Sequence, residues 1–130
     1  ADAITARRMA LWERYHAWAA PLESEGLLRR PVVPAHCTHN AHLYYLLLPS
    51  LDVRTHFIEA LKQRDIGAVF HYIPLHSSPA GQRHARTSGS MRVTDDVTDR
   101  LVRMPLWVGL ENYLDEVLDS ARCALLSGGP

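Results

Sequence analysis

Apolar residues recur at helical spacing in the first part of the chain, over residues 2–20. The apolar positions that follow this period are Ile4, Leu11, Tyr15, Trp18 and Leu22. Asp2 can cap the start of the segment, and Pro21 lacks the backbone N–H that a continuing helix needs. The pattern therefore predicts a helix over residues 2–20.

The same period predicts two more helices with apolar faces, at residues 53–64 and 111–126. Asp52 precedes the first of these as an expected N-cap, and Gly67 follows it as a helix breaker. The second is followed by residues 127–130, which we expect to form a flexible tail.

A further helix is predicted to begin at Thr94, which can act as its cap. Asp95 and Asp96 follow in the first turn, where the helix dipole favours negative charge. These two residues could also form a pair of carboxylates, but the helix start explains them with fewer assumptions.

Three extended segments interrupt the helical pattern, at residues 41–48, 68–70 and 104–107. Residues 72–92, rich in proline and glycine, are predicted to form a long loop, and long loops in small domains are often functional. The resulting order of elements predicts an α+β fold, with a small sheet of about three short strands and helices packed on it.

Composition narrows the class of protein without identifying it. The 130 residues fit one domain, and a formal net charge of zero provides no basic field for nucleic acid. The longest apolar run, residues 43–49, is far shorter than the ~20 residues that cross a bilayer, and no signal peptide is recognisable. Cys37 and Cys123 are expected to be reduced thiols in a cytoplasmic protein.

Cys37 lies among three histidines, which suggests one possible chemistry. His36, His39 and His42 surround this thiol, and imidazole and thiolate are ligands that zinc accepts. The spacing is not that of a zinc finger, so the same residues could be ordinary polar groups before a strand. A metal-dependent binding or assembly module that functions alone therefore stays open as an alternative reading.

A second polar cluster lies at the start of the predicted long loop. His71, Tyr72 and His76 surround a proline and precede two serines. Such donors and acceptors suit a polyhydroxyl or phosphate ligand, although a structural loop with exposed polar groups explains the composition equally well. No nucleophile is paired with an orienting base in a known motif.

At this loop the sequence resembles the DegT/DnrJ/EryC1/StrS family of sugar-nucleotide aminotransferases. Residues 71–76 read HYIPLH, a complete match to the family's H-Y-x-P-L-H segment. Residues 98–106 (TDRLVRMPL) are similar to a later family element, with Met104 where leucine is usual. The opening residues 7–15 and the segment NAHLYY at residues 40–45 are also similar to family elements. The likeness covers residues 1–126.

The resemblance implies the small C-terminal domain of a pyridoxal-phosphate (PLP) enzyme of fold type I, here residues 1–126. Such enzymes are homodimers that use glutamate to aminate a nucleotide-linked 4-keto-6-deoxy sugar. The best likeness is to members that aminate a dTDP-4-dehydro-6-deoxyglucose type of substrate for cell-surface polysaccharide, lipopolysaccharide or enterobacterial common antigen. The family implies that His71 and Tyr72, and less directly His76, lie near the substrate.

The lysine content limits what these residues can do. Thirteen of the fourteen basic residues are arginine, and Lys62 is the single lysine. Its helical angle places it away from the apolar stripe, whereas a lysine that binds PLP needs a desolvated or tuned pocket. We therefore expect no catalytic residue, bound cofactor or metal in these 130 residues, and a PLP lysine in an N-terminal large domain outside them.

Overall fold

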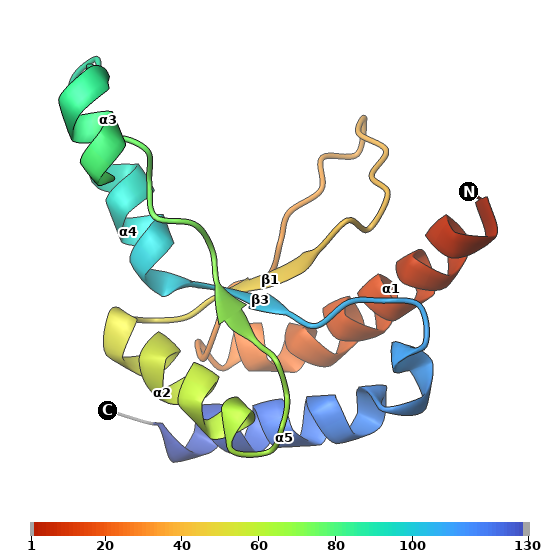
Figure 1. The fold of residues 1–130 in the computed structure, drawn as a ribbon. Helices are drawn as coiled ribbons and strands as arrows, with labels where there is room; N and C mark the ends of the chain where they lie inside the picture. Colours follow the sequence, from red (N-terminus) through yellow and green to blue (C-terminus); the bar gives the residue numbers. More distant parts are fainter. Residues whose placement is uncertain (1, 129–130) are drawn as a thin grey trace.

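The computed structural model describes residues 2–128, and three long helices lie on one side of a three-stranded sheet (Figure 1). In chain order the elements are α1 (Asp2–Ser24), β1 (Tyr44–Leu47), α2 (Leu51–Lys62), β2 (Val69–Phe70), α3 (Pro79–His84), α4 (Arg92–Arg100), β3 (Leu101–Met104), the 3-10 turn η1 (Leu110–Asn112) and α5 (Leu114–Ser127). The predicted α+β class and the small sheet of three short strands are confirmed.

The sheet is antiparallel and has the order β1-β3-β2, so the last strand in the chain is the central one. Tyr44 of β1 pairs with Met104, and Val69 of β2 pairs with Arg103. An isolated bridge between Arg29 and Leu47 extends the pairing on the outer side of β1. β1 and β2 therefore both pair with β3 and not with each other.

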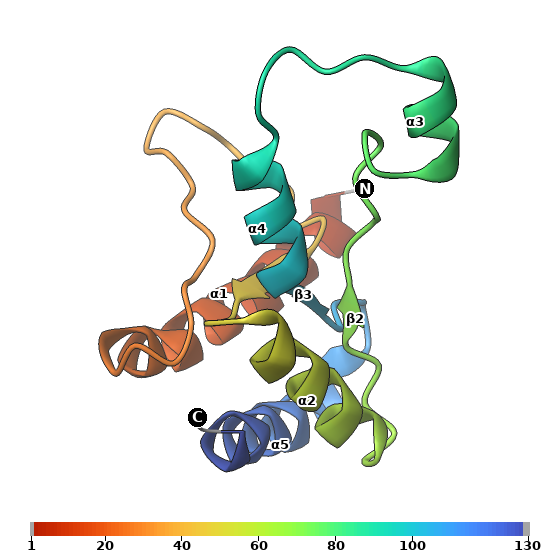
Figure 2. The same cartoon turned by 90° about the vertical axis from the view of Figure 1, so that its left-hand side faces the viewer.

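Side chains alternate between the two faces of the sheet, as strand geometry requires. The buried face carries Tyr44, Leu46, Val102 and Met104, which join the core formed with α1, α2 and α5. Figures 1 and 2 show these helices on that side, while α3 and α4 project from one end of the sheet. The opposite face has no helix directly on it in the described part of the chain.

The prediction that Pro21 ends the first helix is wrong, because α1 continues to Ser24. Proline removes one backbone donor, but the fully buried Leu22 anchors the next turn in the core. Gly26, two residues beyond the end of the helix, has a φ of +76°. The amide of Leu27 then donates to the carbonyl of Leu22 at 3.0 Å, a frequent closure after a glycine.

Both predicted end signals of α2 are wrong by a few residues. Ser50, rather than Asp52, is the N-cap, because its hydroxyl accepts a hydrogen bond from the amide of Val53 at 3.2 Å. The left-handed residue after the helix is Asp65, with φ of +57°, and not Gly67. Aspartate tolerates this conformation better than most residues do, so a glycine was not required.

The predicted loop over residues 72–92 contains the short helix α3. The hydroxyl of Ser78 caps it by accepting from the amide of Gly81 at 3.0 Å, and Pro79 occupies the first turn, where its missing donor costs little. α4 then begins at Arg92, so Thr94 lies inside the helix and does not cap it. The residue at the N-cap position is Met91, whose side chain makes no cap bond.

The last extended segment and the last helix are also displaced from their predicted positions. β3 spans Leu101–Met104, so the predicted strand at residues 104–107 shares only its first residue. α5 begins at Leu114, after η1, and reaches Ser127, one residue into the predicted tail. Residues 129 and 130 of that tail lie outside the described residues. None of the described helices is long and apolar enough to cross a membrane.

The alternation in β1 gives a matched pair of variants. Leu46→Ala removes a fully buried side chain and should lower the free energy of unfolding by about 2–5 kcal/mol. Leu47→Ala, on the half-buried opposite face of the same strand, should cost less than about half of that. Urea unfolding followed by tryptophan fluorescence measures both, and equal losses would contradict the one-sided core.

Candidate functional site

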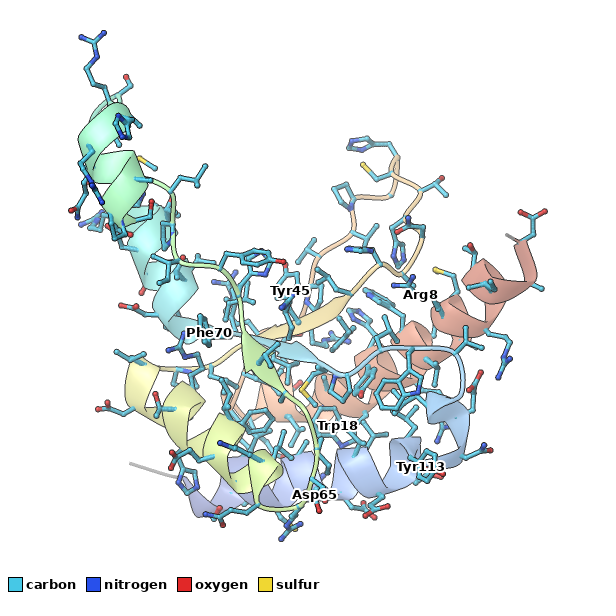
Figure 3. The ribbon with its side chains drawn as sticks, viewed as in Figure 1. Arg8, Trp18, Tyr45, Asp65, Phe70 and Tyr113 are labelled. Carbon is cyan, nitrogen blue, oxygen red and sulfur yellow. The ribbon has the colours of Figure 1, made fainter. Side chains whose placement is uncertain are left out.

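The face of the sheet opposite the core carries a row of side chains across all three strands. Tyr45, Arg103 and Val69 are register partners on β1, β3 and β2, and none of them is fully buried. Tyr45 is labelled in Figure 3, on the side of the sheet away from α5. We call this surface, defined by Tyr45, Val69 and Arg103, the open face.

The structure brings two of the predicted site residues together on the open face. The rings of His71 and Tyr72 lie 4.9 Å apart between centroids at an interplanar angle of 58°. The ring of Tyr72 also lies 5.4 Å from the guanidinium carbon of Arg103, within cation–π range, while 71% of the residue stays exposed. The phenol is therefore oriented by neighbours on both sides and still accessible to a ligand.

His71 contributes a buried polar atom to this group. Its Nδ1 is shielded from solvent and makes no hydrogen bond with any residue of the described chain. Buried polar atoms in native proteins almost always have a partner. This nitrogen can therefore accept or donate a hydrogen bond to a group outside the described residues.

His76 has a different environment from the His71–Tyr72 pair. Its Nε2 lies 2.8 Å from Oδ1 of Asp95 in α4, and its side chain is only 17% exposed. Asp96, the next residue, pairs instead with Arg100 at 2.6 Å, one turn along the same helix. His76 therefore joins the loop to α4, and the two aspartates do not act as a carboxylate pair.

Apolar side chains around the His71–Tyr72 pair are exposed to an unusual degree for one short segment. Phe70, Ile73 and Leu75 are respectively 51%, 62% and 82% exposed. Phe70 lies under the guanidinium of Arg54, 5.7 Å from its carbon, on the wall of a cavity of about 430 Å³ between the loop, α2 and α4. Contiguous apolar exposure of this kind is typical of a surface that another part of a protein covers.

Arg103 and Arg54 are the residues of this region that the sequence analysis missed. Their signal was present but weak: Arg103 occupies the outward position between the apolar Val102 and Met104. Recognising it required the correct strand boundaries. Arg54 bonds the carbonyl of Thr98 at 3.0 Å and so reaches across from α2 to α4.

The histidines around Cys37 do not gather into a metal site. No group of three or more histidine, cysteine, aspartate or glutamate side chains among residues 2–128 is arranged to hold a metal ion. Cys37 is a free, exposed thiol. His39 packs instead against the ring of Trp12, at 4.6 Å between centroids, and its Nδ1 accepts from the amide of Ala41 at 3.3 Å.

Lys62 does not provide a site for an aldehyde cofactor. It is exposed in the last turn of α2, where its charge complements the helix dipole. No wall of apolar side chains removes it from water, as a lysine that binds PLP requires. The residues of this chain therefore do not fit the covalent attachment of PLP.

Sequence comparison identifies relatives of the chain. A sequence model of the DegT/DnrJ/EryC1/StrS aminotransferase family matches residues 1–121. The uncharacterized protein MJ1066 of Methanocaldococcus jannaschii is 34% identical over 99 residues, which cover 73% of this chain and 25% of that protein.

Several solved structures share the fold, among them that of the aminotransferase TlmJ. The chain matches S. venezuelae DesV, solved in complex with a ketimine intermediate, at 25% identity and a TM-score of 0.80, covering 95% of this chain and 32% of DesV. TlmJ from Streptoalloteichus hindustanus matches at 23% identity and a TM-score of 0.81, covering 97% of this chain and 33% of TlmJ. NtdA from Bacillus subtilis, with bound PMP, matches at 17% identity and a TM-score of 0.78, covering 95% of this chain and 28% of NtdA. The chain thus spans between a quarter and a third of the proteins it matches.

The turn that precedes α3, in the loop after the His71–Tyr72 pair, gives a sharp prediction. A Cβ at Gly81 would lie 1.5 Å from the carbonyl oxygen of Leu75, so Gly81→Ala must displace the turn before α3. We expect faster amide exchange at Gln82 and Ala85, whose amides bond the carbonyls of Ser78 and residue 81.

Gly67→Ala is the matched control, because a Cβ there meets no atom within 4 Å. Hydrogen exchange followed by NMR measures both variants. Unchanged exchange in the Gly81→Ala variant would show that the turn does not have the described geometry.

Proposed function

Because the chain belongs to the DegT/DnrJ/EryC1/StrS aminotransferase family, we propose that it is the small C-terminal domain of a PLP-dependent sugar aminotransferase. In this proposal residues 1–126 form the domain and residues 127–130 its tail. The chain covers 33% of TlmJ and 32% of DesV, and in this proposal the remaining two thirds of the enzyme form a large domain that precedes it. The family is one of aminotransferases, and the proposed reaction class follows from it.

The observation that carries this proposal is the one-sided burial of the sheet. Helices α1, α2 and α5 cover one face, while the other presents Tyr45, Val69, Arg103 and the His71–Tyr72 pair, and the strand end and loop that carry this pair expose further apolar side chains. A domain that worked alone would leave this apolar surface in water at a cost in free energy. A large domain or a second subunit of a homodimer that packs there would remove it from water and enclose a pocket.

PLP, when bound, supplies the electron sink on which an amino group is transferred between two substrates. This chain contributes none of the covalent attachment, since its single lysine is exposed on α2. Its residues are proposed to bind and orient the substrate. His71 and Tyr72 offer hydrogen-bonding groups at the open face, and His76 holds their loop against Asp95 of α4.

The proposed substrates are glutamate and a nucleotide-linked 4-keto-6-deoxy sugar of the dTDP-4-dehydro-6-deoxyglucose type. The support is the HYIPLH segment at residues 71–76 and the order of the other motifs that resemble this branch of the family. The product would be an amino sugar for a cell-surface polysaccharide, such as lipopolysaccharide or enterobacterial common antigen, made in the cytoplasm. The metal-binding alternative has no ligand group in residues 2–128 to support it.

The first test compares the activity of the 130-residue chain with that of the longer protein encoded by the same reading frame. The 130 residues alone, with PLP, glutamate and the keto-sugar nucleotide, should form no amino sugar and no borohydride-stable PLP adduct. The longer protein should do both, and Lys62→Gln in it should leave the rate unchanged, because this side chain faces water. Turnover by the 130-residue chain, detected by mass spectrometry, would refute the proposal.

The second test addresses Tyr72 within the longer protein. Tyr72→Phe removes one hydroxyl and keeps the ring over Arg103, so kcat/KM for the sugar nucleotide should fall about tenfold, as for one lost hydrogen bond. The half-reaction with glutamate should not change.

Tyr113→Phe is the control for this measurement. Tyr113 is also an exposed tyrosine, but Figure 3 shows it beside α5, on the other side of the sheet from Tyr45. If both variants lowered kcat/KM equally, or neither did, the hydroxyl of Tyr72 would not bind the substrate.

A further inference from the structure

We propose that Arg103 binds an oxyanion on the open face, with Tyr72 holding its guanidinium in place. The ligand is an oxyanion of one of the two substrates: the diphosphate of the nucleotide sugar or a carboxylate of the amino donor. The identity of the ligand rests on the proposed function; the presence of an anion site rests on the contacts of Arg103 alone.

Arg103 differs from the other partly buried arginines of the chain. Four arginines have a buried Nε with no hydrogen-bond partner, namely Arg8, Arg54, Arg100 and Arg103. The first three still bond through their terminal nitrogens, to carbonyls in each case and in Arg100 also to the carboxylate of Asp96. The side chain of Arg103, by contrast, makes no hydrogen bond and no ion pair with any residue between 2 and 128. A guanidinium carries five donors, so this one lacks acceptors.

The position of the Tyr72 ring leaves those donors available. The guanidinium carbon lies 5.4 Å from the centroid of the Tyr72 ring, which carries no carboxylate or carbonyl acceptor, so this contact uses none of the N–H groups in a conventional hydrogen bond. Carboxylate and phosphate oxygens bind the edge of a guanidinium in pairs, with both hydrogen bonds assisted by charge. The buried Nδ1 of His71, next to Tyr72, is a second polar atom without a partner in the described chain.

The space beside Arg103 has the size and charge for one such group. A cavity of about 170 Å³ lies where β1 begins and β3 ends. Its lining consists of His42, Leu43, Gly67, Val69, Arg103, Met104 and Leu106 and includes no acidic residue. Pockets for whole drug-sized ligands are roughly 300–1,000 Å³, so this one suits a single phosphate or carboxylate and not a complete nucleotide.

The first experiment uses the ¹⁵N-labelled 130-residue chain and two probes, inorganic pyrophosphate and glutamate, titrated separately. Saturable changes in amide chemical shift are expected at residues 42–43, 69–72 and 103–104. Arg103→Gln should weaken the binding about 10–100-fold, the loss typical of a charged hydrogen-bond pair. Arg122→Gln removes the same charge from the exposed surface of α5, across the sheet, and should leave the affinity unchanged.

The two probes separate the two sources of the oxyanion. Binding of pyrophosphate alone assigns the site to the nucleotide sugar, and binding of glutamate alone assigns it to the amino donor. If neither probe shifts these amides, or if Arg122→Gln weakens binding as much as Arg103→Gln, the proposal is overturned. If the Arg103→Gln variant does not fold, the residues whose amide shifts change in the unaltered chain still show whether the anion binds beside Arg103. The Arg103→Lys variant, which keeps the positive charge, should retain part of the affinity.

Kinetics of the longer protein distinguish this inference from the proposed function. Arg103→Gln should raise KM for the substrate that carries the oxyanion and leave the other KM unchanged. Anion binding at Arg103 without any transamination by the longer protein would preserve the site and remove the proposed function. Transamination by the longer protein with no effect of Arg103→Gln on either KM would preserve the proposed function and remove the substrate site at Arg103.

Discussion

β3 is the element on which both the core and the open face depend, because it lies between two strands that do not pair with each other. Val102 and Met104 face the helices, and Arg103, between them, faces the other way. A shift of β3 by one residue would exchange these faces, placing a charged guanidinium in the core. The buried hydroxyl of Tyr15, whose pKa is raised by burial, donates to the carbonyl of Pro105 at 2.9 Å and so fixes the end of β3 against α1.

One-sided burial is the second consequence of this arrangement. A sheet of only three short strands gains enough stability by packing a single layer of helices on one face. The same alternation that sends Leu46 inward sends Tyr45 outward, so core and site come from adjacent residues of one strand. Substitutions on the open face can therefore change the binding surface with little effect on the packing of the core. That separation suits a domain that covers a pocket.

The parts of the fold that the sequence predicted well are those set by periodic apolar patterns over many residues. The three long helices, the strand that contains Tyr44 and the α+β class follow from such patterns, and the His71–Tyr72 pair follows from a motif. The ends of the helices were predicted less well. At the start of α2, for example, Ser50 and Asp52 are both acceptable N-caps, and the local sequence does not distinguish between them. The contact of Tyr72 with Arg103 joins the loop after β2 to β3, and it becomes visible only once the pairing of these strands is known.

The side chains on the open face can donate hydrogen bonds and supply positive charge, and arginine provides both without a lysine. Arginine stays protonated at any physiological pH and offers fixed pairs of donors, which suits the binding of carboxylate or phosphate. A lysine that forms a covalent bond must instead lose its proton, which requires a desolvated environment. The open face is too exposed to provide that environment by itself. In the proposed enzyme, with the donors on this domain and the reactive amine on another, closure of the two would complete the site and exclude water at the same step.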